Sequence, residues 1–190
     1  MTTYHFPADA GASLPADGPS GKAAPGPSAI ATYLERLGLP HAGLRIARRG
    51  DAVRLEGGVP DPATRERVVL AVGNLRGVGR VEDRLVVDQP APGLLDGLAA
   101  FGRLPAGAAT LATAGEAVHR SEPEAGTVFG PGGSLLHTVQ PGESLAAIAA
   151  RHYDGEAAAA ERRILEANAP VLADAVAVRP GIVLRLPPAR

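Results

Sequence analysis

The chain has 190 residues and a formal net charge of −1 at pH 7, so it is long enough for one medium domain or two small ones. This charge balance gives no bulk attraction to nucleic acid or anionic lipid, and we expect no nucleic-acid partner. The absence of cysteine excludes disulfides, thiolate catalysis and zinc–thiolate sites. The 24 glycines and 18 prolines indicate small domains joined by flexible tracts, or the composition bias of a GC-rich genome.

Residues 1–27 are rich in proline, glycine, alanine and serine, and we predict that they form an N-terminal tail. They contain neither the basic segment nor the apolar segment of a secretory signal peptide. No apolar run in the chain approaches the ~18 residues that a membrane-spanning helix needs. The sequence therefore predicts a soluble cytoplasmic protein without a transmembrane segment.

Residues 28–88 carry the pattern of a small unit with the element order α-β-β-α-β. Apolar residues at helical spacing predict a first helix over 28–37. Alternating apolar residues on both sides of Gly50 predict a hairpin. A second helix is expected to begin at Asp61, where an N-cap residue precedes a proline. The run "GRVEDRLVV" (79–87) predicts a closing strand.

Residues 89–134 and 135–188 differ sharply in composition. The first range is rich in glycine, proline and alanine, which predicts a flexible linker with one short amphipathic segment at 94–104. The second range predicts a strand, a turn that ends in the N-cap Ser144, two helices and a final strand, in the order β-α-α-β. The predicted fold class is α+β, with two small domains on either side of the linker.

The second unit resembles a LysM domain, through "HTVQPGESLAAIAARHY" (137–153), "ILEAN" (164–168) and "RPGIVLRLP" (179–187). The first unit resembles a BON domain, through "GDAVRLEGGVPDPATRERVVLAVGNLRGVGRVEDRL" (50–85). A BON domain followed by a LysM domain, without a signal peptide, is similar to a family of small cytoplasmic bacterial potassium-binding proteins. The resemblance extends over 28–88 and 136–187. The long linker departs from that family, whose two domains are nearly adjacent.

The resemblance implies a potassium site that is built from main-chain carbonyl groups. Carbonyl oxygens can replace the hydration shell of potassium, and the end of a helix offers carbonyls without intrahelical partners at the negative end of its dipole. The stretch "AVGNLRGVG" (71–79) ends a predicted helix, and its glycines allow the chain to turn further carbonyls inward. By resemblance the bound ion is K⁺, and a short helix is expected in the N-terminal segment. The carbonyls that the resemblance implies are those of Pro7, Ala10, Gly73, Leu75 and Val78. The competing interpretation is an ordinary helix C-cap without an ion.

The resemblance to LysM domains also implies a shallow groove for peptidoglycan and other N-acetylglucosamine glycans. The residues that match the groove are Gly142, Glu143, Ser144, Leu145, Asn168, Arg179, Pro180, Gly181 and Ile182. Arg179 and Ile182 stand where aromatic and polar residues are frequent in that family. We therefore expect this LysM domain to act as a packing or interaction module.

The remaining polar residues predict no enzyme and no organic cofactor. The five histidines are scattered without metal-ligand spacing, and no nucleophile is paired with a base. Arginines of the first unit alternate with acids. The first interpretation of this pattern is a solvated sheet face, and the second is a contact with lipid headgroups. The arginines are Arg45, Arg48, Arg49 and Arg54.

The leading hypothesis is a non-enzymatic cytoplasmic protein that binds or senses potassium. One alternative is a peptidoglycan-binding protein of the cell envelope. The other is a LysM adaptor of a phage-tail-like assembly, with 94–104 as the site for a protein partner.

Overall fold

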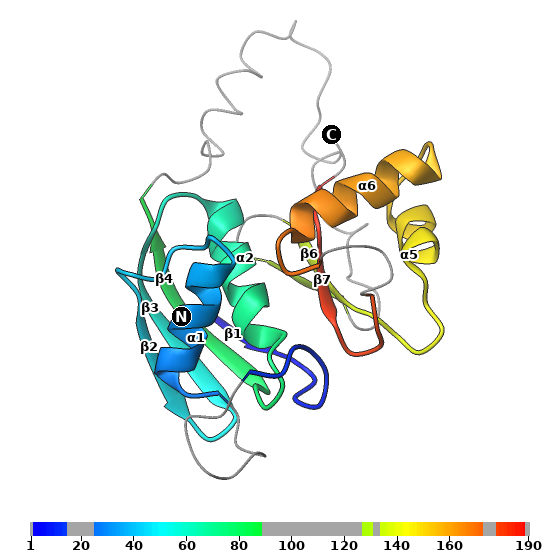
Figure 1. Cartoon of the computed structure of the whole chain (residues 1–190). Coiled ribbons are helices and arrows are strands. Elements are labelled where there is room, and N and C mark those ends of the chain that lie inside the picture. The colour runs from blue at the N-terminus through cyan, green and yellow to red at the C-terminus, as the bar shows by residue number, and fades with distance from the viewer. Residues whose placement is uncertain (1, 15–24, 89–126, 131–133, 173–177, 189–190) are drawn as a thin grey trace, which may run out of the picture.

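The computed structural model describes residues 2–14, 25–88, 127–130, 134–172 and 178–188 (Figure 1). Within these ranges the chain forms four helices and two sheets. The predicted α+β class is therefore confirmed. No helix in the described ranges is both long enough and apolar enough to cross a membrane. The amphipathic segment predicted at 94–104 lies outside the described residues.

The first sheet has four strands in the spatial order β1-β4-β3-β2. The strands are β1 (Thr2–His5), β2 (Arg45–Arg49), β3 (Ala52–Val59) and β4 (Arg80–Val87). β2 and β3 form the predicted hairpin, β3 and β4 pair in parallel, and β1 pairs antiparallel with β4. A parallel pair needs a crossover, and α2 (Pro62–Gly73) supplies it.

Two helices, α1 (Pro27–Arg36) and α2, pack against the first sheet (Figure 1). α1 buries the side chains of Ile30, Tyr33 and Leu34, which the helical spacing placed on one face. Asp61 is the N-cap of α2, and its carboxylate accepts a hydrogen bond from the Thr64 amide at 2.8 Å. This hydrogen bond satisfies one of the free amides of the first turn.

The N-terminal segment differs from the predicted tail with a short helix. Residues 2–14 contain β1 and a turn, and no helix. Tyr4 and Phe6 are buried, whereas Thr3 and His5 are exposed, which is the alternation of a strand with one face on the core. The alternation covers so few residues before Pro7 that it gives no clear signal in the sequence.

The second sheet has the order β5-β6-β7 and carries two helices. Its strands are β5 (Thr127–Phe129), β6 (Leu135–Thr138) and β7 (Val183–Leu186), and its helices are α5 (Leu145–His152) and α6 (Ala157–Asn168). The order from β6 onwards is the predicted β-α-α-β. β5 is an additional strand inside the range predicted as linker, where it pairs antiparallel with β6.

The two units share a hydrophobic core. Leu136 of β6 and Val183 of β7 belong to the same buried cluster as the side chains of the first sheet and its two helices. A second, smaller cluster lies beneath α5 and α6. β7 therefore packs against both parts of the chain, and α2 is its neighbour in the first unit.

Candidate functional site

The loop after α2 is anchored by buried side chains on both sides of Gly77. Leu75 and Val78 are fully buried. The Leu75 carbonyl accepts a hydrogen bond from the Val78 amide at 3.0 Å, and Gly77 between them has φ +88°. A left-handed conformation of this kind favours glycine. The main chain of the loop is thus held in one conformation by its own apolar residues.

The N-terminal segment lies along this loop. Four main-chain hydrogen bonds join the two segments. They run from Phe6 N to Gly79 O at 3.0 Å, from Gly77 N to Ala8 O at 2.6 Å, from Ala12 N to Asn74 O at 2.9 Å and from Arg76 N to Ala12 O at 2.9 Å. Ala12 and Leu75 form an isolated parallel bridge. The segment 6–12 therefore adds its main chain to the C-terminal end of α2.

Two glycines make this close approach feasible. A Cβ atom on Gly73 would lie 2.2 Å from the Phe6 ring. A Cβ atom on Gly11 would lie 2.0 Å from the carbonyl oxygen of Asn74, and Gly11 has φ +87°. Any side chain at either position would force the two segments apart.

The structure brings together the two segments that carry the five carbonyls implied by the resemblance. Pro7 and Ala10 lie in the turn after β1, Gly73 is the last residue of α2, and Leu75 and Val78 lie in the loop that follows. The Pro7 carbonyl accepts a hydrogen bond from the Ala10 amide at 3.1 Å. The carbonyls of Ala10, Gly73 and Val78 accept no hydrogen bond from the described residues. Each carbonyl oxygen has two lone pairs, so all five retain capacity to face a cation.

Asn74 has a role that the sequence did not reveal. Its side chain donates to the Val183 carbonyl and accepts from the Val183 amide, both at 2.8 Å. The residue is 5% exposed. The amide therefore acts as a strand partner for the first residue of β7. A sequence pattern shows only an asparagine after a helix, because its partner lies 109 residues further along the chain.

The loop before β7 completes the surroundings of the candidate site. Gly181 has φ +84°, and a Cβ atom there would lie 2.7 Å from Cβ of Ala10 and 3.5 Å from Cβ of Pro7. The turn that carries part of the predicted potassium site therefore contacts the loop that carries part of the predicted glycan groove.

The polar groove residues in the turn before α5 bind other parts of the unit. Glu143 accepts a hydrogen bond from the Gln140 amide at 2.8 Å and lies 2.9 Å from His137 Nε2 and 2.7 Å from an Arg151 nitrogen. Burial alone would raise the pKa of Glu143, but these three contacts outweigh it and lower the pKa to about 2. Ser144 accepts from the Ala147 amide and so caps α5, as predicted.

Two further groove residues are part of the packing of the second unit. Leu145 is buried in its core. Asn168 donates to the carbonyls of Ile164 and Arg185 and accepts from the Arg185 amide. Asn74 and Asn168 thus form hydrogen bonds with Val183 and Arg185, which are alternate residues of β7. Both do so along the edge of β7 that faces away from β6. Arg179, Pro180 and Ile182 are exposed or half-buried in the loop that leads to this strand.

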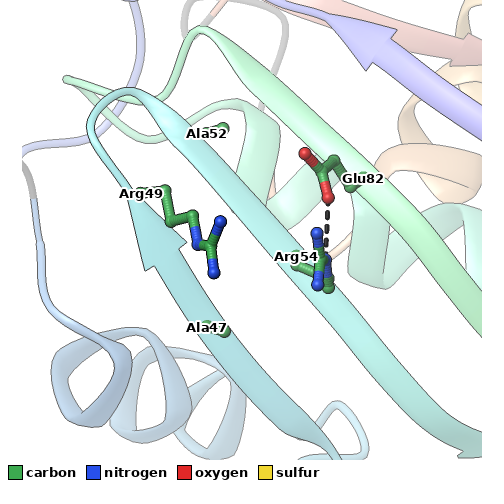
Figure 2. A pocket seen from close by; sticks show the side chains of 5 residues that line it. All are labelled: Ala47, Arg49, Ala52, Arg54 and Glu82. Atoms are coloured by element: carbon green, nitrogen blue, oxygen red, sulfur yellow. Dashed lines mark hydrogen bonds and ion pairs between the residues drawn. The ribbon is translucent and has the colours of Figure 1, made fainter.

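The arginine-rich face of the first sheet forms a small pocket (Figure 2). The pocket has a volume of about 80 Å³, well below the ~300 Å³ of small ligand sites. Arg54 and Glu82 form an ion pair at 2.8 Å, and their hydrogen bond raises the pKa of Arg54 and lowers the pKa of Glu82. The acids interleaved in the sequence therefore pair with arginines on this face. The lipid-headgroup contact remains a prediction.

The sequence matches no protein-family model and no curated protein. Among the described residues, no three histidine, aspartate or glutamate side chains are grouped so that they could hold a metal ion. The site defined by the segments 6–12 and 73–79 consists of main-chain groups, so it is independent of such side chains.

Proposed function

We propose that the chain is a non-enzymatic cytoplasmic potassium-binding protein with a BON and a LysM domain, and that it acts in potassium sensing. Its site lies between the turn at 7–11 and the loop at 73–79. The observation that supports this proposal is the set of four main-chain hydrogen bonds between the two segments. They hold the two segments that carry the implied carbonyl groups side by side.

The electrostatics of α2 favour a cation at this place. The carbonyl end of a helix carries a partial negative charge, and the last turn of α2 has no basic side chain that would neutralise it. The loop is already ordered by Leu75 and Val78, so an ion would bind without a large loss of conformational entropy.

Isothermal titration with KCl, and with NaCl at the same ionic strength, tests the proposal. We expect saturable heat with potassium and a much weaker response with sodium, because a ring of carbonyls suits the larger and less strongly hydrated ion. Absence of potassium-specific heat up to cytoplasmic concentrations would overturn the proposal.

Glycine variants test the location of the site. Gly11→Ala and Gly73→Ala should each weaken potassium binding by about tenfold or more, equivalent to ~1.4 kcal/mol, because the new methyl group separates the two segments. Gly38→Ala is the matched control. Gly38 also has a positive φ, +67°, but no atom lies within 4 Å of the added methyl group. Equal losses in all three variants would indicate general strain and would contradict the assigned location.

The two alternatives predict different binding partners. A peptidoglycan-binding protein would sediment with purified peptidoglycan and would lose this property on Asn168→Ala or Gly142→Ala substitution. An adaptor of a phage-tail-like assembly would copurify with large particles. The internal hydrogen bonds of Glu143, Ser144 and Asn168 favour the packing role of the second unit over the glycan role.

A further inference from the structure

A cleft of about 460 Å³ lies where α2, α6 and the end of β7 meet. Four arginines line it: Arg67 from α2, Arg162 and Arg163 from α6, and Arg185 from β7. Glu166 is the one carboxylate among the described residues of the lining. The cleft is several times larger than the arginine pocket on the first sheet, and its volume falls within the ~300–1,000 Å³ of small-ligand sites.

The charge of these arginines is only partly neutralised. Arg185 is paired with the buried carboxylate of Glu66. Within the described part of the chain, no ion pair involves Arg67, Arg162 or Arg163. On the first sheet, Arg54, Arg80 and Arg84 each face an acid, whereas the ion pairs of the described residues include neither Arg45 nor Arg49. The cleft therefore has an excess of positive charge that ordinary surface pairing does not explain.

Arg67 provides a second and independent observation. Its Nε atom is buried and has no hydrogen-bond partner among the described residues. A buried donor without a partner is costly, so native structures usually satisfy it with a protein group, a water molecule or a ligand. Because Arg67 lines the cleft, a small rotation of its side chain would bring Nε to an acceptor bound there and meet this requirement.

We propose that the cleft binds a compact polyvalent oxyanion of the phosphate class. Planar guanidinium groups match the oxygens of phosphate with paired hydrogen bonds. Arg67 on one wall and Arg162 with Arg163 on the other can each approach a different phosphoryl group. The described lining contains arginine, alanine, proline and glutamate, and no aromatic side chain on which a base could stack. Recognition therefore rests on the charged oxygens.

Such an anion would also join the two units. Arg67 belongs to α2 of the first unit, and Arg162 and Arg163 belong to α6 of the second. A ligand that binds both walls stabilises the arrangement in which they face each other, so it should raise the unfolding temperature. This proposal is independent of potassium binding, and its test is made at constant KCl concentration.

The test is isothermal titration of the full chain with inorganic pyrophosphate, followed by thermal unfolding with and without this anion. We expect saturable binding and a higher unfolding temperature. Arg67→Gln and Arg162→Gln should each weaken binding about tenfold, as expected for loss of one charge-assisted hydrogen bond. Arg67→Lys keeps the charge but removes Nε, and it should lose part of the affinity.

Arg45→Gln is the matched control, because it removes the same charge from an exposed position of β2. Arg162 is exposed, so its substitution tests the cleft without disturbing the core. Equal weakening by Arg45→Gln would show non-specific charge attraction and overturn the proposal. It would also be overturned by the absence of saturable binding, by equal binding of chloride, or by tighter binding of adenosine diphosphate than of pyrophosphate.

Discussion

At the scale of the residue, Asn74 and the glycines around it determine what the loop after α2 can do. Gly73 allows the Phe6 ring to lie against α2, Gly77 turns the chain, and Asn74 directs its side chain towards β7. An asparagine side chain presents one carbonyl and one amide group, as a residue of a neighbouring strand does. This match explains why Asn74 satisfies both main-chain groups of Val183.

Asn74→Ala should lower the free energy of unfolding by about 2–4 kcal/mol. The substitution leaves the amide and the carbonyl of Val183 without partners in a buried position, at ~1–3 kcal/mol each. Urea denaturation measures this loss. Arg76→Ala, at an exposed position of the same loop, is the control and should change stability by less than ~0.5 kcal/mol. Equal stability of the Asn74 variant and the unaltered chain would contradict this role.

Local signals in the sequence predicted local structure well. Ser144 and Asp61 cap their helices because each accepts from an amide three residues away. The glycine-rich loop was predicted as a site through the family resemblance, because its local chemistry alone is that of an ordinary helix C-cap. The partner of Asn74 could not be predicted, because a side-chain amide gives no sign of which distant main-chain group it will meet. The N-terminal half of the candidate site came from the family resemblance alone.

At the scale of the element, the turn between β6 and α5 is held by one carboxylate. Glu143 binds the Gln140 amide within the turn, Arg151 on α5 and His137 on β6. The turn therefore connects strand and helix through a single side chain that must be ionised. This requirement makes the stability of the element dependent on pH.

The stability should fall as the pH drops from about 5 to about 2. The pKa of Glu143 is about 2 in the folded chain and has an ordinary value of 4.5. Between these values the unfolded chain binds a proton that the folded chain does not, so stability rises with pH there, by at most about 1.4 kcal/mol per pH unit for this group. Above pH 5 the contribution is complete. Glu143→Gln should flatten this part of the curve, as measured by urea denaturation at several pH values. An unchanged slope in the variant would show that other carboxylates cause the acid sensitivity.

Two elements could not be predicted from the sequence because their patterns are short. β1 has four residues and β5 has three, and each gains its stability from a neighbouring strand. The longer elements were predicted in the correct order, since helical spacing and alternation repeat often enough in them. Pairing with β4 and β6 is a tertiary effect that overrides the proline- and glycine-rich composition around the two short strands.

At the scale of the whole molecule, close contacts, hydrogen bonds and an ion pair between described residues join the two units. The turn at 7–10 lies against Gly181, Asn74 binds Val183, and the carboxylate of Glu66 binds Arg185. Ser134 also donates its hydroxyl proton to Glu66 at 2.6 Å. Glu66 stands between Arg65 and Arg67 in the sequence, which is typical of a solvated helix face, yet it is fully buried. A charge pattern along one helix does not show which face a second unit will cover.

The pair Glu66–Arg185 should couple the two units strongly. Glu66→Leu alone leaves a largely buried guanidinium without its partner, and Arg185→Met alone leaves a buried carboxylate. Each is expected to lower the free energy of unfolding by about 3–5 kcal/mol. The double variant removes both charges from a low-dielectric environment, so it should be more stable than either single variant.

A double-mutant cycle by urea denaturation measures this coupling. Arg84→Met with Glu56→Leu is the control cycle, because that pair is exposed, with a separation of 3.5 Å, and should couple by less than ~1 kcal/mol. If the losses at Glu66 and Arg185 are simply additive, the ion pair does not hold the units together. A double variant that is more stable than either single variant would show that the junction depends on mutual charge compensation, since neither buried charge is tolerated without the other.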